Sequence, residues 1–222
     1  MNGRAQTKEE QVVVPGESAN LSGVLAVPEN ARGVVLFAHG SGSGRFSPRN
    51  NAVARTLQDA ELATLLVDLL TEEEASDRRF VFNIELLAER LLQCTRWVRD
   101  QVATNSLPIG YFGASTGAGA ALVAAAQYGT DIQAVVSRGG RPDLAGEFLG
   151  SVRSPTLLIV GSLDEQVIEL NRQAMKWMQS PVELVIVEGA THLFEEPGKL
   201  EEVARLARDW FLRYLNPYGD AG

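Results

Sequence analysis

Short apolar segments alternate with helical patterns along most of this 222-residue chain, and this alternation constrains its fold more than any other feature. Segments that are apolar at nearly every position and rich in β-branched residues are typical of strands buried on both faces of a sheet. Strands that alternate with helices predict a mostly parallel sheet with helices on both faces, the α/β class. We expect eight strands, within residues 10–16, 21–28, 32–40, 63–70, 107–115, 132–140, 155–162 and 182–190.

The connections between these segments carry local signals of their own. Pro15-Gly16 separates the first two strands and predicts an antiparallel hairpin. Ser47 and Pro48 are a good N-cap and first-turn residue for a helix over residues 49–62. Further helices are expected near residues 116–129, 143–152, 167–179 and 201–214. The longest helix should have one apolar face formed by Ile84, Leu87, Ala88, Leu91, Thr95, Val98 and Val102.

No segment is left over for a large lid or a second domain. We therefore expect a single domain over residues 1–222, with a flexible polar N-terminus over residues 1–10 and a C-terminal tail over residues 216–222. The loops at the carboxyl ends of the strands should then be open to solvent, and ligands bind at this edge in sheets of this kind.

Composition argues against several classes of partner and location. The net charge is −8 with no block of Lys and Arg, which argues against nucleic acid or an anionic membrane as a partner. The polar first residues lack the apolar core of a signal peptide, and no apolar run is long enough to span a bilayer. The chain has one cysteine, Cys94, so an internal disulfide is excluded and a reducing, cytoplasmic location is expected.

Ser115 lies between two glycines in the segment Gly113-Ala114-Ser115-Thr116-Gly117, where a buried strand is followed by a helix. A sharp strand-to-helix turn that only small residues can form would lift the serine oxygen out of the sheet edge. The N–H of Thr116 would then lie at a helix N-terminus, which favours an oxyanion. This pattern predicts that Ser115 is a nucleophile, and the alternative is a packing junction with a buried hydroxyl.

A serine nucleophile needs a base, and the base needs a carboxylate that orients it. His192 follows the last expected strand and Asp164 follows the strand before it, so both belong to the same edge of the sheet as Ser115. The order Ser115, Asp164, His192 is the order found in α/β-hydrolases. Glu165 is the alternative to Asp164, and an unrelated surface loop is the alternative setting for His192.

The other histidine, His39, lies in the loop after the third expected strand. Hydrolases of this kind take their second oxyanion donor from that loop. We expect the N–H of Ser41 to be this donor, together with the N–H of Thr116, and we expect His39 to brace the loop. The glycines of the loop, followed later by Asp68, match a dinucleotide-binding pattern only weakly.

Taken together, these features resemble the dienelactone hydrolase-like branch of the α/β-hydrolase superfamily over nearly the whole chain. The matching stretches are HGSGS (residues 39–43), GASTG (113–117), GSLDEQV (161–167) and GATHLF (189–194). Dienelactone hydrolase itself uses a cysteine nucleophile, whereas Ser115 holds that position here, and Cys94 falls in the middle of an expected helix. A serine esterase or a related acyl hydrolase therefore fits better than a dienelactone hydrolase.

The resemblance implies a two-step acyl transfer on a small ester or lactone, without a metal or an organic cofactor. His192 would take the proton of Ser115, the N–H groups of Ser41 and Thr116 would hold the oxyanion, and Asp164 would orient the imidazole. The alternatives are an acyltransferase or peptidase that uses the same triad, or a non-catalytic binding protein with this fold.

Arginines gather after the expected strands at the same edge of the sheet: Arg45, Arg49, Arg78, Arg79, Arg138 and Arg141. In a chain of net charge −8, such a group could bind a carboxylate or phosphate on the substrate. Arg45, Arg49 and Arg138 are the expected contacts. The alternative is that the arginines pair with neighbouring acids such as Glu72, Glu73, Glu74 and Glu147.

Overall fold

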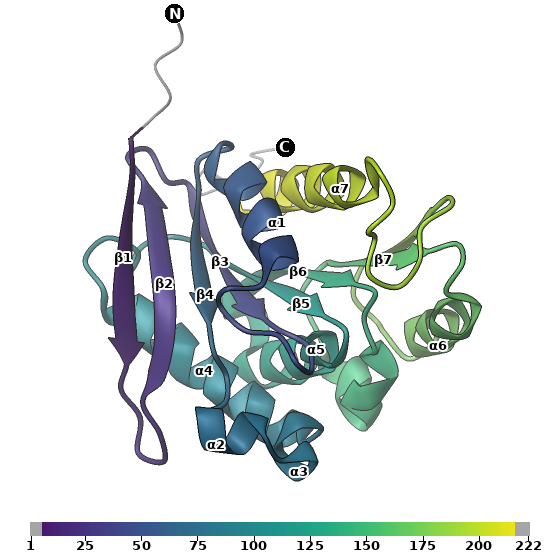
Figure 1. Ribbon diagram of the computed structural model, residues 1–222, viewed down its shortest axis with the longest axis horizontal. Coiled ribbons are helices and arrows are strands. Elements are labelled where there is room, and N and C mark those ends of the chain that lie inside the picture. The colour runs from purple at the N-terminus through teal and green to yellow at the C-terminus, as the bar shows by residue number, and fades with distance from the viewer. Residues whose placement is uncertain (1–5, 216–222) are drawn as a thin grey trace, which may run out of the picture.

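A computed structural model describes residues 6–215 of the chain (Figure 1). The strands are β1 (Thr7–Val14), β2 (Leu21–Pro28), β3 (Gly33–Ala38), β4 (Leu62–Val67), β5 (Ile109–Ala114), β6 (Ile132–Arg138), β7 (Thr156–Gly161) and β8 (Val182–Val187). The α-helices are α1 (Pro48–Gln58), α2 (Glu72–Ala75), α3 (Arg78–Val81), α4 (Ile84–Asp100), α5 (Thr116–Tyr128), α6 (Glu165–Met175) and α7 (Lys199–Tyr214). Two segments are 3-10 helices, η1 (Gly129–Asp131) and η2 (Pro142–Ser151).

The strands form one sheet in the order β1-β2-β4-β3-β5-β6-β7-β8. β1 and β2 form an antiparallel hairpin and β2 is antiparallel to β4, whereas every other neighbouring pair is parallel. The expected eight-stranded, mostly parallel sheet is therefore confirmed. The parallel strands end at one common edge, so the loops that follow β3, β5, β6, β7 and β8 lie together there.

Helices cover both faces of the sheet (Figure 1). α4 and α5 pack on one face, where Leu91 and Ala121 join the core. α1 and α7 pack on the other face, where Leu57 and Phe211 are fully buried. The strands between these layers, such as β3 and β5, are buried at every residue, because both of their faces are covered. Among the described residues, no helix is both long enough and apolar enough to cross a lipid bilayer.

α1 begins at the carboxyl edge of the sheet, as its sequence predicts. Pro48 is its first residue, and the Oγ of Ser47 accepts a hydrogen bond of 3.4 Å from the N–H of Asn50. A proline costs nothing at this position, since the first N–H of a helix has no partner within the helix. The start of α1 is thereby held beside the loops that follow the strands.

Two expectations for the ends of elements are wrong. Residues 7–10 are not a flexible terminus, because β1 begins at Thr7 and pairs with β2 along its whole length. The long helix ends at Asp100, where Thr104 Oγ1 donates to the carbonyl oxygen of Val98, so Val102 is 93% exposed instead of buried. The short helix expected near residues 143–152 is present as the 3-10 segment η2, which is kinked at Gly146 with φ of 53°. The tail expected over residues 216–222 lies outside the described residues.

α2 and α3 were not expected from the sequence. Each has only four residues, which is too short for an apolar periodicity to be visible. α2 is held by a capping box, in which Thr71 and Glu74 accept from each other's backbone N–H groups. Glu74 also pairs with the buried Arg90 of α4 at 3.1 Å, which ties this short segment to the body of the protein.

The end of α4 yields a matched test of this packing. Val98→Ala should lower the free energy of unfolding by about 2 kcal/mol, because Val98 is fully buried and the change removes two methyl groups and leaves a cavity. Val102→Ala should change it by less than about 0.5 kcal/mol, because the side chain is exposed. Urea denaturation of both variants checks this, and equal losses would contradict the observed helix end.

Candidate active site

Ser115 occupies a strained turn between β5 and α5. Its backbone has φ of 51° and ψ of −122°, a conformation that residues with a Cβ rarely adopt. Such backbone strain gathers at functional sites, where the surrounding structure enforces it. Here it is enforced from both sides, since Ser115 N–H donates to the carbonyl oxygen of Arg138 at 3.2 Å and Ser115 O accepts from Ala118 and Arg141.

The two glycines that flank Ser115 are required by close packing. A Cβ at Gly117 would overlap the carbonyl oxygen of Ala38 at the end of β3. A Cβ at Gly113 would lie 2.5 Å from the Cα of Ala118. No side chain fits at either position, so the first turn of α5 can approach the ends of β3 and β5 only with glycine there.

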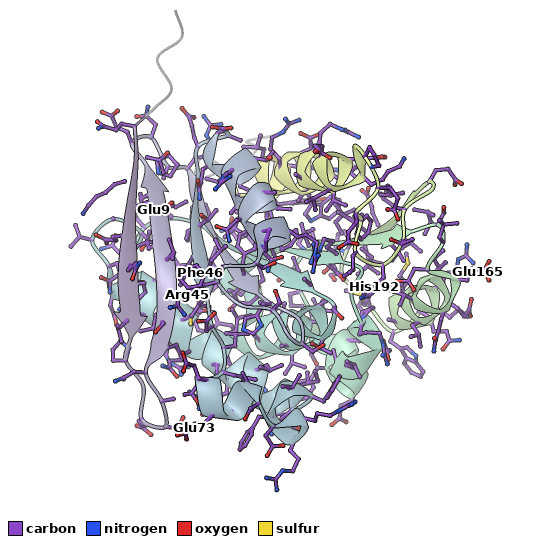
Figure 2. The ribbon with its side chains drawn as sticks, viewed as in Figure 1. Glu9, Arg45, Phe46, Glu73, Glu165 and His192 are labelled. Carbon is purple, nitrogen blue, oxygen red and sulfur yellow. The ribbon has the colours of Figure 1, made fainter. Side chains whose placement is uncertain are left out.

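His192 and Asp164 are joined by a hydrogen bond at the same edge of the sheet. His192 Nδ1 lies 2.6 Å from Asp164 Oδ2, and Nδ1 donates to the carboxylate, so Nε2 is left to face a substrate or a nucleophile. Asp164 follows β7 and His192 follows β8, and both are partly buried. Glu165 lies at the outer side of α6 and is exposed, away from His192 (Figure 2). The contacts therefore favour Asp164 over Glu165 as the partner of the histidine.

The end of β6 connects Ser115 to His192. The carbonyl oxygen of Arg138 accepts from Ser115, and the Cβ position of the next residue, Gly139, is 3.5 Å from the ring of His192. The structure has no hydrogen bond between Ser115 Oγ and His192 Nε2. In proteins without a bound substrate this contact is often long, and it tightens when substrate binds.

Two backbone N–H groups beside Ser115 make no hydrogen bond to any described residue: those of Ser41 and Thr116. Both residues line one cavity of about 110 Å³. Its other wall is apolar and comes largely from α2, α3 and α4, through Leu70, Ala75, Val81 and Leu87. Sequence analysis did not predict this wall, because α2 and α3 are too short to show an apolar periodicity. An oxyanion formed near Ser115 could accept hydrogen bonds from these two free N–H groups, which line the cavity.

His39 braces the loop that carries Ser41. Its Nδ1 donates to the carbonyl oxygen of Gly40 at 3.0 Å, and its Nε2 accepts from the N–H of Leu69 at 3.0 Å. Burial lowers the pKa of His39, so the ring is neutral at physiological pH and can act as donor and acceptor at once. With both nitrogens in use, His39 matches the bracing role expected for it.

The arginines of this edge differ in their partners. Arg45 is bound to Asp68 through both its backbone N–H and its guanidinium, so Asp68 fastens the loop. Arg49 pairs with Glu195 at 3.0 Å. Arg141 pairs with Asp143, and Arg79 with Asp77. Pairing with acids is thus common, although none of these partners is one of the four acids expected. Arg138 has no acidic partner among the described residues.

Cys94 takes no part in this site. It is fully buried in α4, and burial raises the pKa of its thiol to about 12. A thiol that stays protonated is a poor nucleophile. Cys94 is thus a small apolar residue of the core, in the middle of a helix as expected.

The chain is similar to hydrolases of known structure and to mycobacterial proteins of another name. The dienelactone hydrolase of Anabaena variabilis is 54% identical, with a TM-score of 0.93 over 95% of this chain and 100% of that one. Est1E of Butyrivibrio proteoclasticus shares the fold at 16% identity, with a TM-score of 0.79 over 91% of this chain and 98% of its own. No protein-family model matches the chain.

Curated relatives of similar sequence come from Mycobacterium tuberculosis. There a protein named "Putative phosphoribosyl transferase" is 58% identical over 215 residues, 97% of this chain. The match covers 48% of the mycobacterial protein, so this chain spans about half the length of the curated relatives that it matches.

Proposed function

Because the chain belongs to the dienelactone hydrolase-like branch of the α/β-hydrolase superfamily, we propose that it is a serine hydrolase that cleaves a small ester or lactone. The observation that carries this proposal is the 2.6 Å hydrogen bond between His192 and Asp164, placed beside the strained turn of Ser115. Such a constellation activates a hydroxyl for attack on an acyl carbon.

The proposed reaction has two steps. His192 Nε2 takes the proton of Ser115 Oγ as the oxygen attacks the carbonyl carbon, and the N–H groups of Ser41 and Thr116 stabilise the resulting oxyanion. His192 then protonates the leaving alcohol, and an acyl-serine remains. In the second step His192 activates a water that releases the acid. Asp164 holds the imidazole in the required tautomer and stabilises its charged form throughout.

The apolar cavity limits the size of the substrate group that can bind beside Ser41 and Thr116. An apolar cavity of about 150 Å³ in another protein accepts benzene, and the cavity beside Ser41 and Thr116 is about 110 Å³. It therefore suits a short aliphatic group. The proposed substrate class is a short-chain ester or lactone, and a cytoplasmic location is part of the proposal.

We do not propose phosphoribosyl transfer, the function in the name of the mycobacterial relatives, for this chain. This chain matches about half of their length. A Ser-His-Asp site transfers acyl groups by way of an ester on serine, whereas phosphoribosyl transfer makes a bond to a sugar carbon. The alternatives that remain for this site are an acyltransferase or peptidase with the same triad, or a binding protein that has kept the fold.

A panel of 4-nitrophenyl esters tests the proposal. The protein should hydrolyse the acetate and butyrate faster than the octanoate, and Ser115→Ala should lower kcat by up to about a million-fold. Ser137→Ala is the matched control: this buried serine lies one strand away with an unpaired hydroxyl, and its loss should leave kcat unchanged. A Ser115→Ala protein that retained most of its activity would overturn the proposal.

The acid of the triad can be tested separately. Asp164→Asn should lower kcat by about 10⁴-fold, because the amide favours the wrong histidine tautomer. Glu165→Gln, one residue later and exposed, should have little effect. Steady-state kinetics with 4-nitrophenyl acetate compares the two. A large loss in Glu165→Gln with a small one in Asp164→Asn would show that the acid is wrongly assigned.

A further inference from the structure

Arg138, the last residue of β6, is a buried arginine without a partner. Only 8% of it is exposed, and its Nε and Nη1 are buried without any hydrogen bond. Its Nη2 also makes no hydrogen bond to a described residue. A guanidinium has five N–H donors in a fixed planar fork, a geometry that matches carboxylate and phosphate groups. None of these donors has a protein acceptor within the described chain.

The guanidinium of Arg138 is buried near a second positive charge, that of Arg49. Burial lowers its pKa to about 10 and the nearby charge of Arg49 adds to this effect, while no carboxylate acts in the opposite direction. The side chain remains charged at neutral pH. An isolated buried charge is unfavourable, and fully buried arginines in proteins normally have a partner. The absence of a partner in the protein therefore points to a ligand that supplies one.

Arg138 lies next to the proposed nucleophile. It is the register partner of Ala114, directly before Ser115, on the neighbouring strand about 4.8 Å away. Its side chain is on the same face of β6 as Val136, the face that α1 and α7 cover. Arg49 is the second residue of α1, and it pairs with Glu195, three residues after His192. Arg138 thus lies between the start of α1 and the loop that carries His192.

We propose that Arg138, assisted by Arg49, binds an anionic group of the substrate, a carboxylate or a phosphate. The proposal rests on the hydrolase function proposed above and narrows its substrate class to esters with a short arm and an anionic arm. The short arm fits the apolar cavity by α4, and the anionic arm lies toward α1, on the opposite face of the sheet. Of the three arginines expected to contact the substrate, Arg45 is held by Asp68 through both its guanidinium and its backbone N–H, so it is left out of the proposed site. Arg49 pairs with Glu195 through Nη1 only, and its buried Nε makes no hydrogen bond to a described residue.

Matched pairs of esters test this assignment. 4-Nitrophenyl butyrate and mono-4-nitrophenyl succinate differ by a carboxylate on the acyl arm. Phenyl acetate, 4-acetoxybenzoate and 4-acetoxyphenyl phosphate differ by a carboxylate or a phosphate on the leaving arm. The wild-type protein should have a higher kcat/KM for an anionic ester than for the neutral ester of the same set, in at least one of the two sets. The anionic ester with the higher kcat/KM identifies both the anion and the arm of the substrate that carries it. Arg138→Met should lower that preference by about 10- to 100-fold.

Two further measurements separate binding from a structural role. Arg138→Met should unfold at the same temperature as the wild type or higher, because the change removes an unpaired buried charge. Arg205→Met, at an exposed site on α7, should leave the preference unchanged. No preference in the wild-type protein, or equal losses on neutral and anionic esters in Arg138→Met, would overturn the proposal. If Arg138→Met does not fold, Arg138→Lys must lower the preference, since lysine lacks the planar fork.

The proposal remains testable if the hydrolase function fails. If no ester of any pair is hydrolysed, the function proposed for Ser115 is wrong. Calorimetric binding of inorganic phosphate and of acetate then tests Arg138 directly. Binding by the wild-type protein that is lost in Arg138→Met would support an anion site, and equal binding or none would overturn it.

Discussion

The close approach of the first turn of α5 to the ends of β3 and β5 determines the geometry of the whole site. Gly117 lies against the carbonyl oxygen of Ala38 so tightly that no side chain fits. This contact forces the chain through a sharp turn, and Ser115 takes up the strain at φ of 51°. The same approach brings the free N–H of Thr116 beside the loop that contains Ser41. The nucleophile and both oxyanion donors proposed here thus depend on one packing contact.

The parallel sheet supplies the rest of the arrangement. Because β5, β6, β7 and β8 are neighbours that end at one edge, residues far apart in the sequence are brought within contact distance. The Asp164–His192 hydrogen bond spans 28 residues, and the Arg49–Glu195 pair spans 146. Interactions on this edge are also divided between the two faces of the sheet. The apolar cavity borders α4, whereas the unpaired guanidinium of Arg138 lies toward α1.

The features of the fold and the site that could be predicted are those that depend on local sequence patterns. Buried strands appear in the sequence as continuous apolar runs, so the sheet could be predicted. The turn could be predicted because its close packing allows only small residues around Ser115. Val102 fits the apolar spacing of α4, but the helix ends before that residue, where the side chain of Thr104 donates to the carbonyl oxygen of Val98. An apolar periodicity contains no information about such a side-chain hydrogen bond. The four-residue helices α2 and α3 leave no pattern, and arginine partners such as Asp68 and Glu195 are fixed only by tertiary contacts.

Covalent labelling measures the central claim, that the strained Ser115 is an activated nucleophile, most directly. A fluorophosphonate should react with the folded protein in a one-to-one ratio, and mass spectrometry of its peptides should place the adduct on Ser115 and on no other serine. Asp164→Asn should slow the labelling, because the imidazole that activates the hydroxyl loses its orientation. An unlabelled protein, or an adduct on another residue, would contradict the account.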